Sequence, residues 1–247
     1  MKKIMMILAV VVLLLGASGQ AMAAFVDGDL IRVVYNGLGT GTEYATDLGN
    51  FSTLTSNSLG NVVLNTDNFN LSSVGAPDQA YVAYYMVTST PGFAGNYVWT
   101  SGPTSSQTGG GRNMFSNFLG GVHSVDGAYN VAAAGASATT LLQSDANSYW
   151  TIMNTAGAGQ GQMRGFIPAG NADQNLAALS TTGYVDQYLY YYATPNTASS
   201  GLQVATLRTF ADGHTELNPS ATPIPATFLL FGSGLLGLVG IRRKQAA

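Results

Sequence analysis

The chain has 247 residues, with nine basic and twelve acidic side chains and no cysteine. It therefore forms no disulfide, thiolate metal site or cysteine nucleophile, and carries no lipidated N-terminal cysteine. A folded domain in this chain must depend on its apolar core for stability, since no covalent cross-link supports it.

The first 23 residues have the pattern of a secretory signal peptide. Two lysines follow Met1, an apolar run covers 4–15, and Ala21 and Ala23 are small residues suited to a cleavage site. We expect export through the Sec machinery, with signal peptidase releasing a mature chain that begins at Ala24. The alternative is an uncleaved anchor, although the run is short for a membrane span of ~20 residues.

The body of the chain, residues 24–218, is acidic. It holds all twelve acidic residues, four arginines and no lysine, which gives a formal net charge of −8. Nucleic-acid binding and docking on anionic lipid both require clustered positive charge, so the composition argues against both partners. Gly, Ser, Thr, Asn and Ala dominate, as in a β-rich domain with polar loops or a partly disordered coat protein, and tyrosine- and valine-rich segments favour the β-rich domain.

Several body segments combine β-branched and aromatic residues between turn residues, which is typical of strands. They are residues 29–35, 43–48, 61–65, 79–88, 96–100, 184–193, 202–210 and 215–217. Gly-rich and Asp-Gly turns predict that the first two form a hairpin and that the last two form another. Residues 79–88 are expected to pair with 96–100, and their nearly continuous apolar run indicates burial on both faces or one face of exposed tyrosines.

Helical structure is expected in only two places. Residues 112–119 have apolar side chains at helical spacing and are followed by a Gly-Gly stop. Residues 136–153 are ambiguous, and we interpret them as a short helix followed by a strand. The pattern predicts a mainly β fold, an antiparallel β-sandwich or jelly-roll-like body with one or two short helices.

The sequence offers no recognisable catalytic motif. His123 and His214 have acidic neighbours in the chain, but the body contains no G-x-S-x-G elbow, and the chain contains no P-loop or dinucleotide fingerprint. We therefore expect no catalytic or cofactor-binding residues. Asp27 and Asp29 are weak calcium candidates, because carboxylates suit that ion, and a plain polar turn is the alternative.

Tyrosines crowd the predicted strands at 79–88 and 184–193. Aromatic rings with polar tips hold sugars by stacking and hydrogen bonding, whereas most strand aromatics pack in the core. The candidates for glycan-facing side chains are Tyr81, Tyr85, Tyr188, Tyr190 and Tyr192.

Residues 219–247 form a linker and a distinctive tail. Pro223-Ile224-Pro225-Ala226 opens an uncharged apolar segment at 226–241, followed by the basic cluster Arg242, Arg243 and Lys244. As a helix the apolar segment would be about 24 Å long, slightly short of the ~30 Å hydrocarbon core. Thinning of the bilayer and snorkelling allow such a helix to cross, with the basic cluster on the cytoplasmic side. A buried core helix is the alternative.

This tail resembles the PEP-CTERM sorting signal of Gram-negative bacteria that make extracellular polysaccharide. Ile224 stands where the commonest motif has Glu, so the tail is nearer the Val-Pro-Leu-Pro-Ala variant. The resemblance covers only the tail. It implies processing by an exosortase, transient anchoring in the inner membrane and delivery to the cell surface or matrix.

Together these features predict a non-enzymatic matrix or cell-surface protein associated with exopolysaccharide or biofilm. A carbohydrate- or calcium-binding module exported to the same location is the second hypothesis. A secreted hydrolase is the third, and it would require paired carboxylates in a deep pocket or a His-Asp-Ser cluster.

Overall fold

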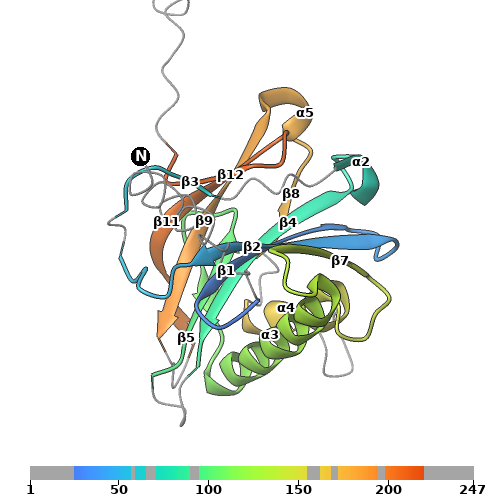
Figure 1. Ribbon diagram of the computed structural model, residues 1–247. Coiled ribbons are helices and arrows are strands. Elements are labelled where there is room, and N and C mark those ends of the chain that lie inside the picture. The colour runs from blue at the N-terminus through green and yellow to red at the C-terminus, as the bar shows by residue number, and fades with distance from the viewer. Residues whose placement is uncertain are drawn as a thin grey trace, which may run out of the picture.

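The computed structural model describes residues 25–56, 59–64, 71–89, 95–154, 162–167, 172–193 and 198–219 (Figure 1). The expected signal peptide, its cleavage site and the sorting signal with its membrane helix lie outside these residues. Within the described part of the chain, the helices are too short or too polar to span a bilayer.

The described strands pair antiparallel, and ten of them join in one curled sheet (Figure 1). Its order is β3 (Val62–Leu64), β12 (Thr215–Leu217), β11 (Leu202–Phe210), β9 (Tyr184–Ala193), β5 (Tyr97–Gly102), β4 (Ala80–Thr88), β1 (Asp29–Asn36), β2 (Thr42–Asn50) and β7 (Ala138–Leu142), with β8 (Gln174–Asn175) paired to β4. A separate pair joins β6 (Thr108–Gly109) and β10 (Ser199–Ser200). The prediction of a mainly β, antiparallel body is confirmed.

Local sequence signals account for the nearest pairings. The two predicted hairpins are present as β1–β2 and β11–β12, and β4 pairs with β5 as expected. The strand pairings between distant segments, such as β1 with β4 and β5 with β9, arise from packing in the core and carry no turn signal.

One long helix, α3 (Arg112–Ala133), lies against the sheet, so the prediction of a short helix ending at residue 119 is wrong. The apolar stripe continues past the Gly-Gly pair, because Val122, Val125 and Tyr129 repeat the helical spacing of Phe118 and are buried with it. The shorter helical segments are α2 (Leu71–Val74), the π-helix η1 (Trp150–Asn154), α4 (Gln162–Phe166) and α5 (Leu179–Thr182).

Residues 136–153 reverse the predicted order of helix and strand. Strand β7 comes first and pairs with the edge of β2, and the helical turn η1 follows it. The β-branched residues Thr139 and Thr140 suit an edge strand once β2 offers a partner. The start of η1 depends on Glu43, which lies about a hundred residues earlier in the chain.

The central strands are buried on both faces, which explains the continuous apolar run of β4. Tyr85 and Val87 enter a first core between the sheet and α3, while Tyr84 and Met86 enter a second core on the opposite face. The first core also contains side chains of η1 and α4, and Figure 1 shows α3 and α4 together beside the sheet.

The second core is enclosed where the sheet curls back on itself. Arg32 of β1 is fully buried there, and its guanidinium donates to Thr215 Oγ1 of β12 and to Thr46 Oγ1 of β2, each at 3.1 Å. The hydroxyl of Tyr84 bonds Thr215 as well. These contacts link strands that are far apart in the sheet order, so they stabilise its curvature.

Candidate functional site

A cavity of about 310 Å³ opens at one end of the first core, and we call it the aromatic pocket. Side chains from β1, β4, η1, α4 and the chain before β8 converge on it. Its lining residues are Tyr35, Gly37, Tyr81, Trp150, Asn154, Arg164 and Asp173.

Aromatic rings form much of the wall of the aromatic pocket. Tyr35 and Tyr81 are direct partners in the β1–β4 pairing, and their rings stack with centroids 5.8 Å apart and planes 15° apart. The Trp150 ring lies 5.7 Å from Tyr35 at 56°. Tyr35 is buried, whereas Tyr81 and Trp150 are half-buried and leave part of their surface exposed.

Polar groups stand beside the rings. Asp173 accepts a hydrogen bond from the Tyr149 hydroxyl at 2.7 Å, and Asn154 donates to the Tyr35 hydroxyl. Burial raises the pKa of Asp173 to about 6, against the opposing effects of its tyrosine hydrogen bonds and of the Arg164 charge. Arg164 is exposed at the rim, so the aromatic pocket offers a cation, an amide and a carboxylate.

Glu43 holds the element that carries Trp150. Its Oε1 accepts from the Tyr129 hydroxyl and from the backbone N–H of Tyr149, each at 2.7 Å, and its Oε2 accepts from the N–H of Trp150 at 3.0 Å. The side chain is fully buried, and this burial raises its pKa to about 7 although the three donors oppose the shift. Glu43 therefore satisfies the first N–H groups of η1 and positions Trp150.

Two glycines let the β1–β2 turn approach the rings closely. A Cβ at Gly37 would lie 2.5 Å from the Tyr81 ring, and one at Gly39 would lie 2.6 Å from the Trp150 ring. Gly39 also has a φ of +71°, a left-handed conformation that favours glycine. A side chain at either position would force the neighbouring ring to move.

The tyrosines proposed to face glycans have different environments. Tyr81 lines the aromatic pocket, and Tyr188 is half-buried on β9 outside it. Tyr85, Tyr190 and Tyr192 are buried in the first core and do not reach the surface. For these three side chains the packing alternative holds, because both faces of the central strands are covered.

Asp27 and Asp29 form hydrogen bonds with different residues. Asp27 bonds the backbone N–H of Ser89 at 2.9 Å and His123 Nε2 at 3.1 Å, while Asp29 accepts from the Asn50 amide at 3.1 Å. The described residues contain no group of three or more acidic or histidine side chains arranged to hold a metal ion. The calcium hypothesis therefore gains no geometric support.

His214 lies in the turn before β12. Its ring bonds Asp212 and stacks on Phe210 with centroids 4.0 Å apart. These contacts are typical of a histidine that stabilises a turn.

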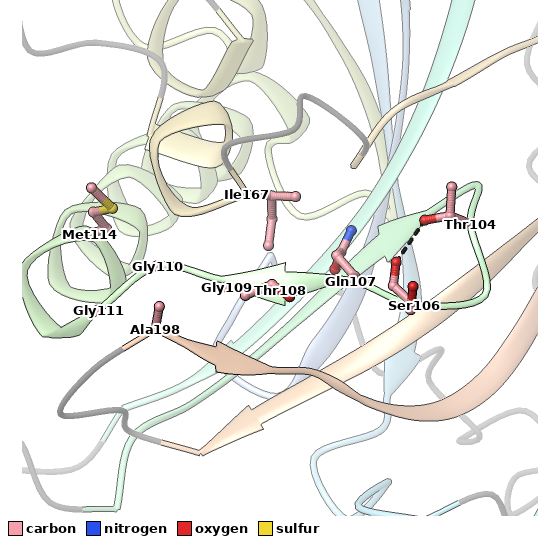
Figure 2. Close-up of a pocket in the computed structure, with 10 residues that line it drawn as sticks. All are labelled: Thr104, Ser106, Gln107, Thr108, Gly109, Gly110, Gly111, Met114, Ile167 and Ala198. Atoms are coloured by element: carbon pink, nitrogen blue, oxygen red, sulfur yellow. Dashed lines mark hydrogen bonds between the residues drawn. The ribbon is translucent and has the colours of Figure 1, made fainter.

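A second pocket, of about 500 Å³, lies beside β6 and the start of α3 (Figure 2). Met114, Ile167 and Ala198 give it an apolar wall, and at one end the Thr104 hydroxyl donates to the backbone carbonyl of Ser106. Gln107 is the buried polar side chain here, and it already bonds Thr100, Ser101 and Tyr192. The aromatic pocket combines ring faces with converging polar groups and is the better candidate site.

Comparison with protein-family models, curated proteins and solved structures finds no match for this chain. The site therefore rests on geometry. Of the tyrosines that the sequence suggests as glycan-facing, only Tyr81 lines the aromatic pocket. Trp150, Asn154, Arg164 and Asp173 come from segments without a motif, and only the fold brings them together.

Proposed function

We propose that this chain is an exported matrix or cell-surface protein of a Gram-negative bacterium, sorted by an exosortase-type system and associated with exopolysaccharide. The observation that carries the proposal is the tail, in which a Pro-x-Pro motif, an apolar segment and a basic cluster follow in the order of the PEP-CTERM signal. The finer architecture belongs to the same proposal: a signal peptide, a sandwich-like or jelly-roll-like body and a C-terminal membrane helix.

The proposed sorting signal makes a testable prediction. Changing Pro223→Ala and Pro225→Ala together is expected to leave the tail uncleaved, so the protein accumulates in the inner membrane. Immunoblotting of cell fractions against an epitope placed in the body measures this. The matched control is Pro219→Ala, which removes a proline from the linker outside the motif and should leave processing unchanged. Equal processing of both variants would contradict the proposal.

A carbohydrate-binding module exported to the same location is the second candidate function. The observation that favours it is the aromatic pocket, where half-buried Tyr81 and Trp150 rings stand beside Asp173 and Arg164. Sugar-binding sites use this combination, because a ring face covers the apolar face of a sugar while polar groups bond its hydroxyls.

The remaining hypotheses have less support. A secreted hydrolase needs two accessible carboxylates facing each other or a nucleophile with its base. Among the described residues, the aromatic pocket supplies one carboxylate, Asp173. The pair Asp29 and Asp47 is buried rather than open to a substrate. We therefore favour binding over catalysis as the activity of the body.

A further inference from the structure

We propose that the aromatic pocket binds a neutral pyranose unit, as part of a saccharide chain, in preference to a carboxylated sugar. This inference rests on the carbohydrate-binding function proposed above and names its ligand class. It concerns the body of the protein and is independent of how the tail is processed.

The size of the site suits one sugar ring. At about 310 Å³ the aromatic pocket lies at the lower end of the ~300–1,000 Å³ range of small-molecule sites. Tyr81 and Trp150 are both half-buried, so each offers ring surface while its other contacts hold it in place. A pyranose has a flat apolar face of C–H groups that such rings can cover.

The polar groups match hydroxyls, which both donate and accept hydrogen bonds. Arg164 supplies only donors, the ionised Asp173 carboxylate only acceptors, and the Asn154 amide both. Asp173 accepts from Tyr149 through Oδ1, and a carboxylate has about four lone-pair sites, so acceptor capacity remains for a sugar hydroxyl.

Charge selects against an acidic sugar. Arg164 is the one basic side chain among the lining residues that the structure describes, and the Asp173 carboxylate beside it offsets its charge. The body as a whole carries a formal net charge of −8. A uronate carboxylate entering this site would meet like charge at close range, which lowers affinity.

The site is preorganised. Glu43 fixes the start of η1, the glycines of the β1–β2 turn allow close packing against both rings, and Tyr35 is buried beneath them. Binding therefore orders few side chains, which reduces the entropic cost that usually weakens sugar recognition.

Tryptophan fluorescence tests the inference on the full-length chain, purified in a detergent without a sugar headgroup. The chain has two tryptophans, and Trp99 is buried in the second core, so a ligand in the aromatic pocket should change the emission of Trp150. The probes are neutral oligosaccharides of glucose, galactose, mannose and N-acetylglucosamine, and the acidic polymers alginate and polygalacturonate.

Variants separate this site from other surfaces. Arg164→Ala removes an exposed side chain without disturbing the core, and Tyr81→Ala removes a ring; both should weaken binding of the neutral ligand at least tenfold. Trp150→Phe should retain binding by calorimetry while losing the fluorescence change. Tyr188→Ala, which truncates a half-buried tyrosine outside the aromatic pocket, should bind as the parent does.

Saturable binding of a neutral saccharide that Arg164→Ala and Tyr81→Ala weaken, with at least tenfold weaker binding of the acidic polymers, supports the inference. Binding of the acidic polymers alone overturns it and leaves carbohydrate binding standing. No binding of any probe, or binding that Tyr188→Ala weakens as much as Tyr81→Ala does, overturns both the inference and the carbohydrate-binding function.

Discussion

Replacing Glu43 by alanine is expected to lower the free energy of unfolding by about 3 to 5 kcal/mol, since its three donors lose their acceptor in a buried site. The donors are the Tyr129 hydroxyl and the backbone N–H groups of Tyr149 and Trp150. Each unsatisfied buried donor costs about 1 to 3 kcal/mol, and the missing side chain also leaves a cavity. Urea denaturation followed by circular dichroism measures the loss.

The body contains one other glutamate, which provides the matched control. Glu216 is half-buried on β12 and faces Arg208 across the strand pair. Glu216→Ala should change the free energy of unfolding by less than about 1 kcal/mol, because the attraction between partly exposed charges is weak. If the two variants were equally stable, Glu43 would not hold η1 in place, and the aromatic pocket would lose its main support.

Stability is expected to fall as the pH rises from about 4 to about 7, because buried carboxyl groups must ionise in the folded protein. Burial raises the pKa of Asp126 to about 7, and the nearby carboxylates of Asp27, Asp29 and Asp47 add to the shift against the hydrogen bond from Tyr85. Below its unfolded pKa the group is neutral in both states. Between the unfolded-state and folded-state pKa values only the unfolded chain releases the proton, so the free energy of unfolding falls as the pH rises.

The variant Asp126→Asn isolates this effect. At pH 8 it should stabilise the protein by about 1 to 3 kcal/mol, because an amide avoids the cost of a buried charge. The amide oxygen can still accept the hydrogen bond that the Tyr85 hydroxyl donates to Asp126 at 2.7 Å in the parent. The melting temperature should therefore rise by about 5 °C at pH 8 and change little at pH 4.

Asp78→Asn is the control for this prediction, since Asp78 is exposed and its replacement leaves the core unchanged. Its melting temperature should follow that of the parent at both pH values. A parent protein that becomes more stable between pH 5 and pH 8, or an Asp126→Asn variant less stable than the parent at pH 8, would show that Asp126 is stabilising in its ionised form.

Much of the sheet was predictable from the sequence. Alternation and β-branched residues indicated β1, β2, β4, β9 and β11, and turn residues indicated the hairpins, because these signals act over a few residues. The full length of α3 does not follow from the Gly-Gly pair, which is typical of a helix end, because the apolar stripe of Val122 and Val125 continues beyond it.

The candidate site was mostly not predictable, because it depends on contacts between distant segments. Tyr35 and Tyr81 meet through the β1–β4 pairing, and Trp150 joins them only because Glu43 holds η1. One signal was available: Glu43 is one of only two glutamates in the body and lies within a predicted strand. A charged residue in that position suggests a specific buried partner.

The central claim is that the chain is exported and that a sorting system removes its tail. The most direct test is the intact mass of the protein in each cell fraction, with the exosortase gene present and deleted. We expect an extracellular form that begins near Ala24 and lacks the tail from about Pro225, and in the deletion strain a form that retains the tail in the inner membrane. A tail present in both strains would contradict the account and identify a membrane-anchored periplasmic domain instead.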